Sequence, residues 1–519
     1  MWIALVLAST LGAQVPRKPK LVVAVVVDQF RYDYLTRFRA DYHGGLDRML
    51  RQGAVFTNAH YVQAPTVTAV GHSIIMTGAM PSVSGIVGNT WLDRNSGKHV
   101  TSVCDWDYQV VGAATPEQGK RCDDADPASP KRLLVSTVGD ELRNRDERSK
   151  VFGISLKARS AILPSGHRAN GAFWFDDKTG VFVSSTYYGE QLPLWVREFN
   201  QRKLPDQFLN ANWKGFESWN FHPDPGSLRP YEKLPASPWA NELLEGLAEK
   251  AIDAEKLGQR DATDLLTLSF SANDYVGHQT GPDTPEVRDM AIRTDQLLGK
   301  LMDLVAERVG AENALFVLSA DHGVAPAPET EQQRKMPGGY ISVDVEDLVR
   351  TTLVRSFGPG DYIQGVVDNA IYLNHKTLDD KKIDVTPLYR AVSEALFRVP
   401  QAHVARVFTK EQLSGGLAGD PIGRAMSNGF NPARSGDILL LFEPYFMPKQ
   451  RPSAKTTHFT PYNYDTHVPV IFFGAGVKAG WRQEKIEVND IAPTLAALMD
   501  VETPSGAFGR VLTEILAAQ

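Results

Sequence analysis

Short, continuous runs of apolar residues recur along the chain between polar and glycine-rich stretches. Most of these runs are rich in leucine or β-branched residues and do not alternate with polar residues. That pattern is typical of strands in a sheet covered on both faces. The runs that we interpret as buried strands are Leu21–Val27, Val151–Ile154, Leu265–Phe270, Leu315–Ser319, Ile438–Phe442 and Val468–Phe473.

Segments whose apolar residues have helical spacing lie between these strands. One of them follows Pro65 and precedes Gly78, which are start and stop signals of a short helix. Strands that alternate with helices predict an α/β fold with a mostly parallel sheet between helices. The predicted helices are Thr68–Met76, Trp239–Leu257, Pro285–Val309 and Asp490–Met499.

Two stretches interrupt this alternation. Residues 165–238 are rich in aromatic residues, Pro, Asn and Gly and contain few periodic runs. Residues 343–431 contain a strand-like Asn369–Leu373, a helix-like Val385–Phe397 and a glycine-rich loop from Ser414 to Pro421. We interpret both stretches as inserted cap subdomains within a single domain over residues 20–519.

Size, composition and charge restrict the class of protein. The 519 residues are enough for one large α/β domain with insertions, and 43% hydrophobic with 22% charged residues is ordinary for a globular protein. The net charge of −6 argues against a general nucleic-acid binder, although a local cluster of metals and basic side chains could still attract an anionic substrate.

The N-terminus and the cysteines indicate an exported protein. An apolar run from Trp2 to Leu7 leads into small residues with a cleavage site after Ala13, so residues 1–13 are expected to be a signal peptide. The run is too short to span a bilayer. The two cysteines, Cys104 and Cys122, suggest one disulfide in an oxidising compartment, the alternative being two unpaired thiols. We therefore expect a periplasmic or secreted protein.

Aspartate and histidine follow several of the predicted strands. Asp28 ends the first strand, where ligands gather in open parallel sheets, although an aspartate there is often only a helix cap. Asp274 and His278 stand four residues apart after another strand, and Asp321 and His322 are adjacent after a third. Imidazole nitrogen together with carboxylate oxygen is a typical zinc ligand set.

A further histidine comes from a late segment that contains both His458 and His467. With either one, the chain offers six candidate ligands, whereas a structural zinc site closes with four. Six ligands split three and three would leave open positions on two metals. Paired metals about 4 Å apart suit an in-line displacement at phosphorus.

Thr66 and Thr68 lie at the start of the predicted helix Thr68–Met76. A hydroxyl at a helix N-terminus sits where backbone N–H groups and the helix dipole favour an anion, which suits a nucleophile for phosphoryl transfer. The alternative is that either threonine is only an N-cap.

Taken in order, these motifs resemble the alkaline phosphatase superfamily. The match comprises Asp28, the segment from Pro65 to His72, the motifs NDYVGH and SADHG, and the late segment TTHF…YDTHVPVIF. Within the superfamily the chain is similar to the phosphate-irrepressible alkaline phosphatases, a monoesterase branch close to the nucleotide pyrophosphatase/phosphodiesterases.

The resemblance implies a role for each site residue. Thr68 would be the nucleophile, and Asn89, Lys157 and Arg159 would contact the non-bridging oxygens of the phosphoryl group. An amide, a point charge and a guanidinium fork can hold the terminal oxygens of a monoester dianion. The two implied zinc sites are Asp274, His278 and His458 for one ion, and Asp28, Asp321, His322 and Thr68 for the other.

The expected activity is hydrolysis of small phosphate monoesters through a phosphothreonine intermediate, without nucleic-acid binding and without a transmembrane segment. The main alternative is a phosphodiesterase or nucleotide pyrophosphatase of the same superfamily, against which Lys157 and Arg159 argue. A sulfatase would need a Cys or Ser nucleophile motif that the chain lacks around Thr68. A zinc-stabilised binding protein without activity would be expected to have lost the nucleophile or a ligand.

Overall fold

The computed structural model describes residues 18–114, 126–449 and 454–517. The expected signal peptide at residues 1–13 lies outside these ranges, and so does Cys122. Cys104 is disulfide-bonded. Within the described ranges no helix is both long enough and apolar enough to cross a membrane.

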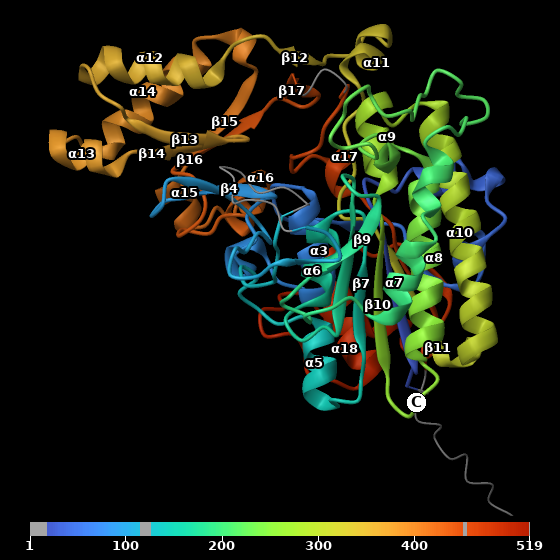
Figure 1. Ribbon diagram of the computed structural model, residues 1–519. Coiled ribbons are helices and arrows are strands. Elements are labelled where there is room, and N and C mark those ends of the chain that lie inside the picture. The colour runs from blue at the N-terminus through green and yellow to red at the C-terminus, as the bar shows by residue number, and fades with distance from the viewer. Residues whose placement is uncertain (1–17, 115–125, 450–453, 518–519) are drawn as a thin grey trace, which may run out of the picture.

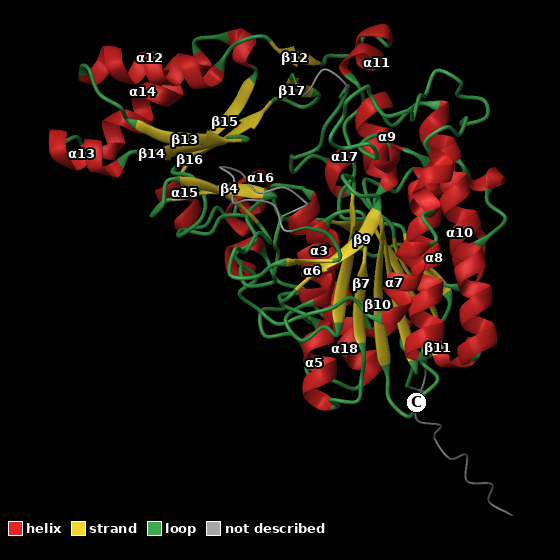
Figure 2. Cartoon of the chain, viewed as in Figure 1, coloured by secondary structure: helices red, strands yellow, loops and turns green. Residues whose placement is uncertain are grey.

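A ten-stranded sheet forms the centre of the molecule, with helices on both sides of it (Figures 1 and 2). The middle strands are buried along their whole length, which is why their sequences are continuous apolar runs. In spatial order the strands are β19 (Gly480–Arg482), β2 (Ala54–Phe56), β18 (Val470–Gly474), β11 (Ala314–Ser319), β1 (Leu21–Val27), β10 (Asp264–Phe270), β7 (Val151–Ile154), β8 (Gly171–Asp176), β9 (Val181–Ser185) and β6 (Val110–Val111).

Strands β11, β1, β10, β7 and β8 run parallel to one another, as an α/β fold requires. The expected run Val468–Phe473 forms β18, which begins two residues later and pairs antiparallel with β11. Strand β9 is also antiparallel to its neighbour β8. The α/β fold class with a mostly parallel sheet is confirmed.

Helices pack along both faces of this sheet. Helices α8 and α10 lie beside each other on one side, and α3, α6 and α18 pack on the other (Figure 1). The helices on the two faces include α3 (Thr68–Thr77), α5 (Val138–Arg145), α6 (Ala158–Ser165), α8 (Pro238–Glu255), α10 (Pro285–Val309) and α18 (Ile491–Met499).

A second, four-stranded antiparallel sheet has its own hydrophobic core under three helices (Figure 2). The prediction that Ile438–Phe442 belongs to the parallel sheet is wrong, because this run forms β16 in the small sheet. The small sheet has the order β13 (Ile363–Val367), β14 (Ala370–Leu373), β16 (Ile438–Phe442) and β15 (Val404–Thr409), and its helices are α12 (Val345–Phe357), α13 (His375–Lys381) and α14 (Val385–Phe397).

The contacts that join the small sheet to the rest of the chain include a short strand ribbon and an ion pair. A parallel ribbon of β12 (Gly339–Ile341) and β17 (Phe446–Pro448) connects them. Arg94 also donates to buried Asp437 at 2.9 Å. That residues 165–238 and 343–431 are insertions in one domain stays a prediction.

Candidate active site

The candidate ligands converge because four neighbouring parallel strands end at the same edge of the sheet. Asp321 follows β11, Asp28 follows β1, Asp274 lies in helix α9 (Ala272–Thr280) just after β10, and Lys157 follows β7. The carboxyl ends of adjacent parallel strands lie side by side, which is where open α/β sheets bind ligands. All four side chains are buried.

His458 reaches this edge for a different topological reason. Strand β18 runs antiparallel to β11, and its first residue, Val470, pairs with Ser319 at the end of β11. The segment that leads into β18 therefore arrives at the edge where β11 ends. There the ring of His458 stacks on that of His322, with 3.5 Å between centroids.

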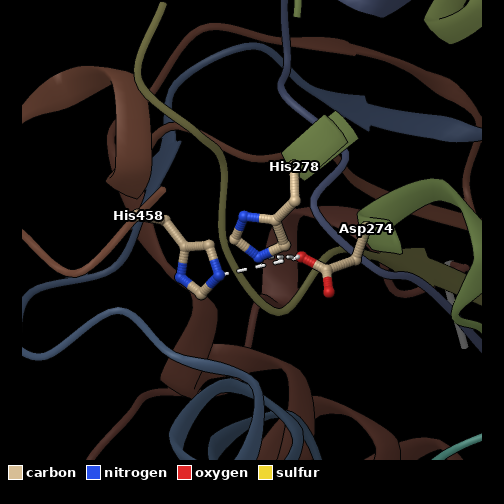
Figure 3. A group of neighbouring side chains, drawn as sticks. All are labelled: Asp274, His278 and His458. Carbon is tan, nitrogen blue, oxygen red and sulfur yellow. Dashed lines mark ion pairs between the residues drawn. The ribbon is translucent and has the colours of Figure 1, made fainter. Parts of the chain in front are cut away.

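The first ligand group consists of Asp274, His278 and His458 (Figure 3). One donor atom from each lies within 4.8 Å of the other two. His278 Nε2 is 3.1 Å and His458 Nε2 is 3.7 Å from Asp274 Oδ1. The four-residue spacing puts Asp274 and His278 on the same side of α9, one turn apart.

Backbone carbonyls fix the ring orientation of both histidines. His278 Nδ1 is 2.8 Å from Thr456 O, and His458 Nδ1 is 2.7 Å from Thr66 O. Because a carbonyl oxygen only accepts, each Nδ1 carries a proton and each Nε2 faces Asp274 Oδ1. Burial opposes the charged form of His278, but the Asp274 carboxylate outweighs it and raises the pKa of this histidine. Burial beside His322 and His278 lowers the pKa of His458 well below its usual value, so its imidazole is neutral. A neutral, oriented imidazole is the form that binds a metal.

The second group contains Asp28, Asp321 and His322. His322 Nε2 lies 3.3 Å from Asp321 Oδ2 and 3.6 Å from Asp28 Oδ1, while Nδ1 is held by Gly323 O at 2.9 Å. These three atoms, Asp28 Oδ1, Asp321 Oδ2 and His322 Nε2, are buried and have no hydrogen-bond partner among the described residues. Donor atoms of Asp28, Asp274 and His322 also fall within 4.8 Å of one another, so Asp274 lies close to both groups.

The donor set fits metal ions. Three buried carboxylates lie together, and buried charges are stable only when paired or when they coordinate a metal. Burial, together with Asp321, raises the pKa of Asp28 well above its usual value. Three orphaned donor atoms that face one another, next to the neutral imidazole of His458, are what a bound cation would satisfy. Residues in both groups are therefore suited to metal binding.

Lys157 is the cation that this structure places among the carboxylates. Its Nζ donates to Asp28 Oδ2 at 2.5 Å and to Asp274 Oδ2 at 2.7 Å. Burial alone would lower its pKa, but Asp274 and Asp28 outweigh that effect and raise it. Lys157 therefore remains charged and bridges the two ligand groups.

The segment that carries the candidate nucleophile is held against both groups. Thr66 O accepts from His458, and a Cβ on Gly71 would collide with the backbone of Asp321. Thr68 is the first residue of α3 and is buried. Neither threonine caps the helix, since the N-cap is Val67 and no side chain accepts there. The hydroxyl of Thr66 is engaged with Thr460 O at 3.0 Å.

The residues expected to hold the phosphoryl oxygens open onto one cavity of about 950 Å³. Asn89, Lys157 and Arg159 line it together with Asp274, His278 and His458. Asn89 Oδ1 accepts from the N–H of Ala69 at 2.9 Å, so the amide oxygen is engaged with the start of α3 and the amide nitrogen is the end that could donate to a ligand. The structure thus brings all the predicted site residues to one edge of the sheet.

Gln29 was missed by sequence reasoning. Its side-chain amide donates to Asp274 Oδ1 at 2.6 Å, and its backbone N–H donates to Asp321 Oδ1 at 3.1 Å. Its backbone is left-handed, with φ of 61°. A Cβ at Gly277 would collide with Gln29 Oε1, so the glycine of the NDYVGH motif makes room for this contact. The one feature of the sequence that could have pointed to Gln29 is its position directly after the candidate ligand Asp28.

His467, the other late histidine, lies apart from Asp274. Its ring stacks between Tyr32 and His60, with 4.3 and 4.5 Å between centroids, and its Nε2 is 3.0 Å from Thr57 O.

The sequence matches the type I phosphodiesterase / nucleotide pyrophosphatase family over residues 22–467. It is 36% identical to alkaline phosphatase PafA of Elizabethkingia meningoseptica over 99% of this chain and 98% of that protein. It is 35% identical to alkaline phosphatase PhoV of Synechococcus elongatus over 97% and 94% of the two chains.

Solved structures agree with the sequence matches. The crystal structure of wild-type PafA has a TM-score of 0.89 at 36% identity and covers 97% of this chain and 100% of its own. A second PafA structure, in which one Thr, one Asn, one Lys and one Arg are substituted, has a TM-score of 0.88 over the same shares of the two chains.

Proposed function

The chain belongs to the type I phosphodiesterase / nucleotide pyrophosphatase family, and on that premise we propose that it is an alkaline phosphatase that hydrolyses phosphate monoesters at a two-zinc site. Thr68 is the nucleophile of this proposal. Asp274, His278 and His458 hold one zinc ion, and Asp28, Asp321, His322 and Thr68 hold the other.

The main support for this proposal is that α3 and the segment before it contact both ligand groups. Thr66 O fixes His458 of the first group, and Gly71 packs on the backbone of Asp321 in the second. Thr68 stands between these two contacts at the N-terminus of the helix. At this position a helix dipole and two bound cations would favour an anion, which suits a nucleophilic oxygen.

Bound zinc would lower the pKa of the nucleophile and stabilise negative charge on the attacking and leaving oxygens. The Thr68 oxygen forms a bond to phosphorus while the bond to the leaving-group oxygen breaks. Water then hydrolyses the phosphothreonine and releases inorganic phosphate. Asn89, Lys157 and Arg159 hold the three terminal oxygens in line during both steps.

The family also contains diesterases, and the three phosphate-binding residues favour a monoesterase. A monoester dianion has three terminal oxygens, whereas a diester has two and carries less charge. Full-length similarity to PafA and PhoV, both named alkaline phosphatases, supports the same choice. The substituted PafA structure was changed at one Thr, one Asn, one Lys and one Arg, the residue types of Thr68, Asn89, Lys157 and Arg159.

Export is part of the proposal. The apolar segment from Trp2 to Leu7 and the disulfide-bonded Cys104 support a periplasmic or secreted enzyme.

The metal requirement tests this function. Elemental analysis of the purified chain is expected to give about two zinc ions per chain. Excess chelator should abolish phosphate release from an aryl phosphate, and zinc should restore it. One bound metal per chain, or full activity in chelator, would contradict the two-zinc site.

A further inference from the structure

His72 belongs to the Gly71–His72 motif, and the proposed chemistry gives it no task. It is fully buried in α3, one turn after Thr68. Its Nδ1 faces two acceptors, Thr68 O at 2.9 Å and Asp321 Oδ2 at 3.2 Å. Its Nε2 is 2.9 Å from the hydroxyl of Ser269. The ring thus lies between the nucleophile helix and a candidate metal ligand.

The oxygens near Nδ1 cannot donate, so Nδ1 carries a proton, and its hydrogen bond goes to Thr68 O. The hydroxyl of Ser269 lies on the other side of the ring, at Nε2. Asp321 Oδ2 has no hydrogen-bond partner among the described residues, and His72 Nδ1 lies 3.2 Å from it. The N–H of His72 is thus placed between Thr68 O and an unpartnered oxygen of Asp321.

A row of buried hydroxyls continues from Ser269. Its Oγ lies 3.4 Å from Ser271 Oγ, which lies 2.7 Å from Ser155 Oγ. The backbone N–H of Lys157 donates to Ser155 Oγ at 3.3 Å. The three hydroxyls thus connect the His72 ring to the backbone of Lys157, and Ser271 Oγ also lies 3.4 Å from Ser269 O. All three serines are at most 2% exposed.

We propose that His72 is a positioning residue that orients the carboxylate of Asp321 for metal binding. The inference rests on the proposed metal site. A ligating carboxylate binds well only when its rotation is restricted, and hydrogen bonds from outside the ligand set supply that restriction. Gln29 N–H donates to Asp321 Oδ1, and His72 Nδ1 lies 3.2 Å from Oδ2, within reach of it once the carboxylate turns. The serine row in turn holds the ring and ties it to the loop that carries Lys157.

The competing role is local. If His72 Nδ1 donates only to Thr68 O within the helix, His72 stabilises α3 and has no effect on the orientation of Asp321. The amide of Asn places its nitrogen near the position of Nδ1, whereas the amide of Gln reaches toward the position of Nε2. His72→Asn therefore keeps a donor for Asp321, and His72→Gln keeps only the contact with Ser269.

The test compares metal binding by the full-length chain carrying His72→Asn, His72→Gln or Ser73→Ala. Ser73 is the matched control, because it is equally buried in α3 but donates to Val70 O at 2.8 Å and not to a ligand. Chains stripped of metal are titrated with zinc against a chromophoric chelator. Cobalt(II) is bound in parallel, since its visible absorption reports coordination geometry. Thermal unfolding without metal shows that each chain is folded.

We expect His72→Gln to weaken the second zinc-binding step by about tenfold to a hundredfold and to change the cobalt spectrum. The zinc affinity of His72→Asn should stay within a few-fold of that of the unsubstituted chain. Ser73→Ala should bind zinc as tightly as the unsubstituted chain. Equal affinities for His72→Asn and His72→Gln, whether both normal or both weak, would overturn the inference and leave the proposed function standing. If the unsubstituted chain bound no zinc, the proposed function would fail, and the inference with it.

Discussion

The candidate ligand residues are oriented by hydrogen bonds to specific partners, and all but His278 are buried. His278 and His458 each give their Nδ1 proton to a backbone carbonyl, and Asp274 and Asp321 each accept from Gln29. The sequence predicts the ligands, because Asp and His after buried strands are recognisable metal donors. It does not predict Gln29, because glutamine is not a zinc ligand type and its role depends on φ of 61°.

Thr68→Ala is expected to lower kcat for an aryl phosphate by about a thousandfold or more, because the nucleophilic oxygen is removed. Thr66→Ala is the matched control. It removes only the hydrogen bond to Thr460 O, which contributes about 1 kcal/mol to stability, and should leave kcat nearly unchanged. Steady-state rates at saturating zinc decide this. The reverse ranking would move the nucleophile to Thr66.

His458→Ala is expected to weaken zinc binding by about a hundredfold or more, because it removes one of three ligands and exposes the others to water. His467→Ala deletes a histidine from the same segment that stacks on Tyr32 and His60 instead. It should bind zinc like the unsubstituted chain, with some loss of thermal stability. A zinc titration in which His467→Ala is the weaker binder would exchange the two roles.

The sequence predicts the bounds of the buried strands well, but it does not predict which neighbouring strands they pair with. The run Leu21–Val27 forms β1 with the expected bounds, because a continuous apolar run bounded by polar residues has few alternatives. Ile438–Phe442 has the same pattern, yet it lies in the small antiparallel sheet. Apolar content reports burial, whereas the choice of sheet and the direction of β18 depend on connections that a local pattern does not contain.

Helix α3 packs so closely on the loop of Asp321 that Gly71 has no room for a methyl group. We expect Gly71→Ala to cost about 1–3 kcal/mol of stability through overpacking and to weaken metal binding by displacing Asp321. Gly246→Ala is the control, since a Cβ there meets Phe199 at an ordinary 3.5 Å and alanine favours the α8 helix. Thermal unfolding should separate the two. A Gly71→Ala chain as stable as the unsubstituted chain, with normal zinc affinity, would show that the contact is loose.

At the scale of the molecule, the cavity is built from three parts of the chain. Asp274 and Lys157 at the edge of the large sheet line one part of it, Phe175 of β8 and Arg229 line another, and Asp368 and Phe442 line a third. At about 950 Å³ the cavity exceeds what a phosphate group needs, so we expect the second and third parts to surround the leaving group of a bound substrate. The sequence indicates segments outside the core there, but their lack of periodicity hides which side chains face the substrate.

The central claim is that this site is built for monoesters. Its most direct test is the ratio of kcat/KM for an aryl phosphate monoester to that for the matching diester, measured with the unsubstituted chain and with the Lys157→Ala/Arg159→Ala double variant. Each charge-assisted contact in the transition state contributes on the order of 1.5–3 kcal/mol, so the double variant should lose about a hundredfold or more on the monoester. Lys157 also bridges Asp28 and Asp274, and damage to the metal site would lower both rates alike. The account predicts a ratio well above one in the unsubstituted chain that falls sharply in the double variant. A ratio below one, or an equal loss on both substrates, would contradict it.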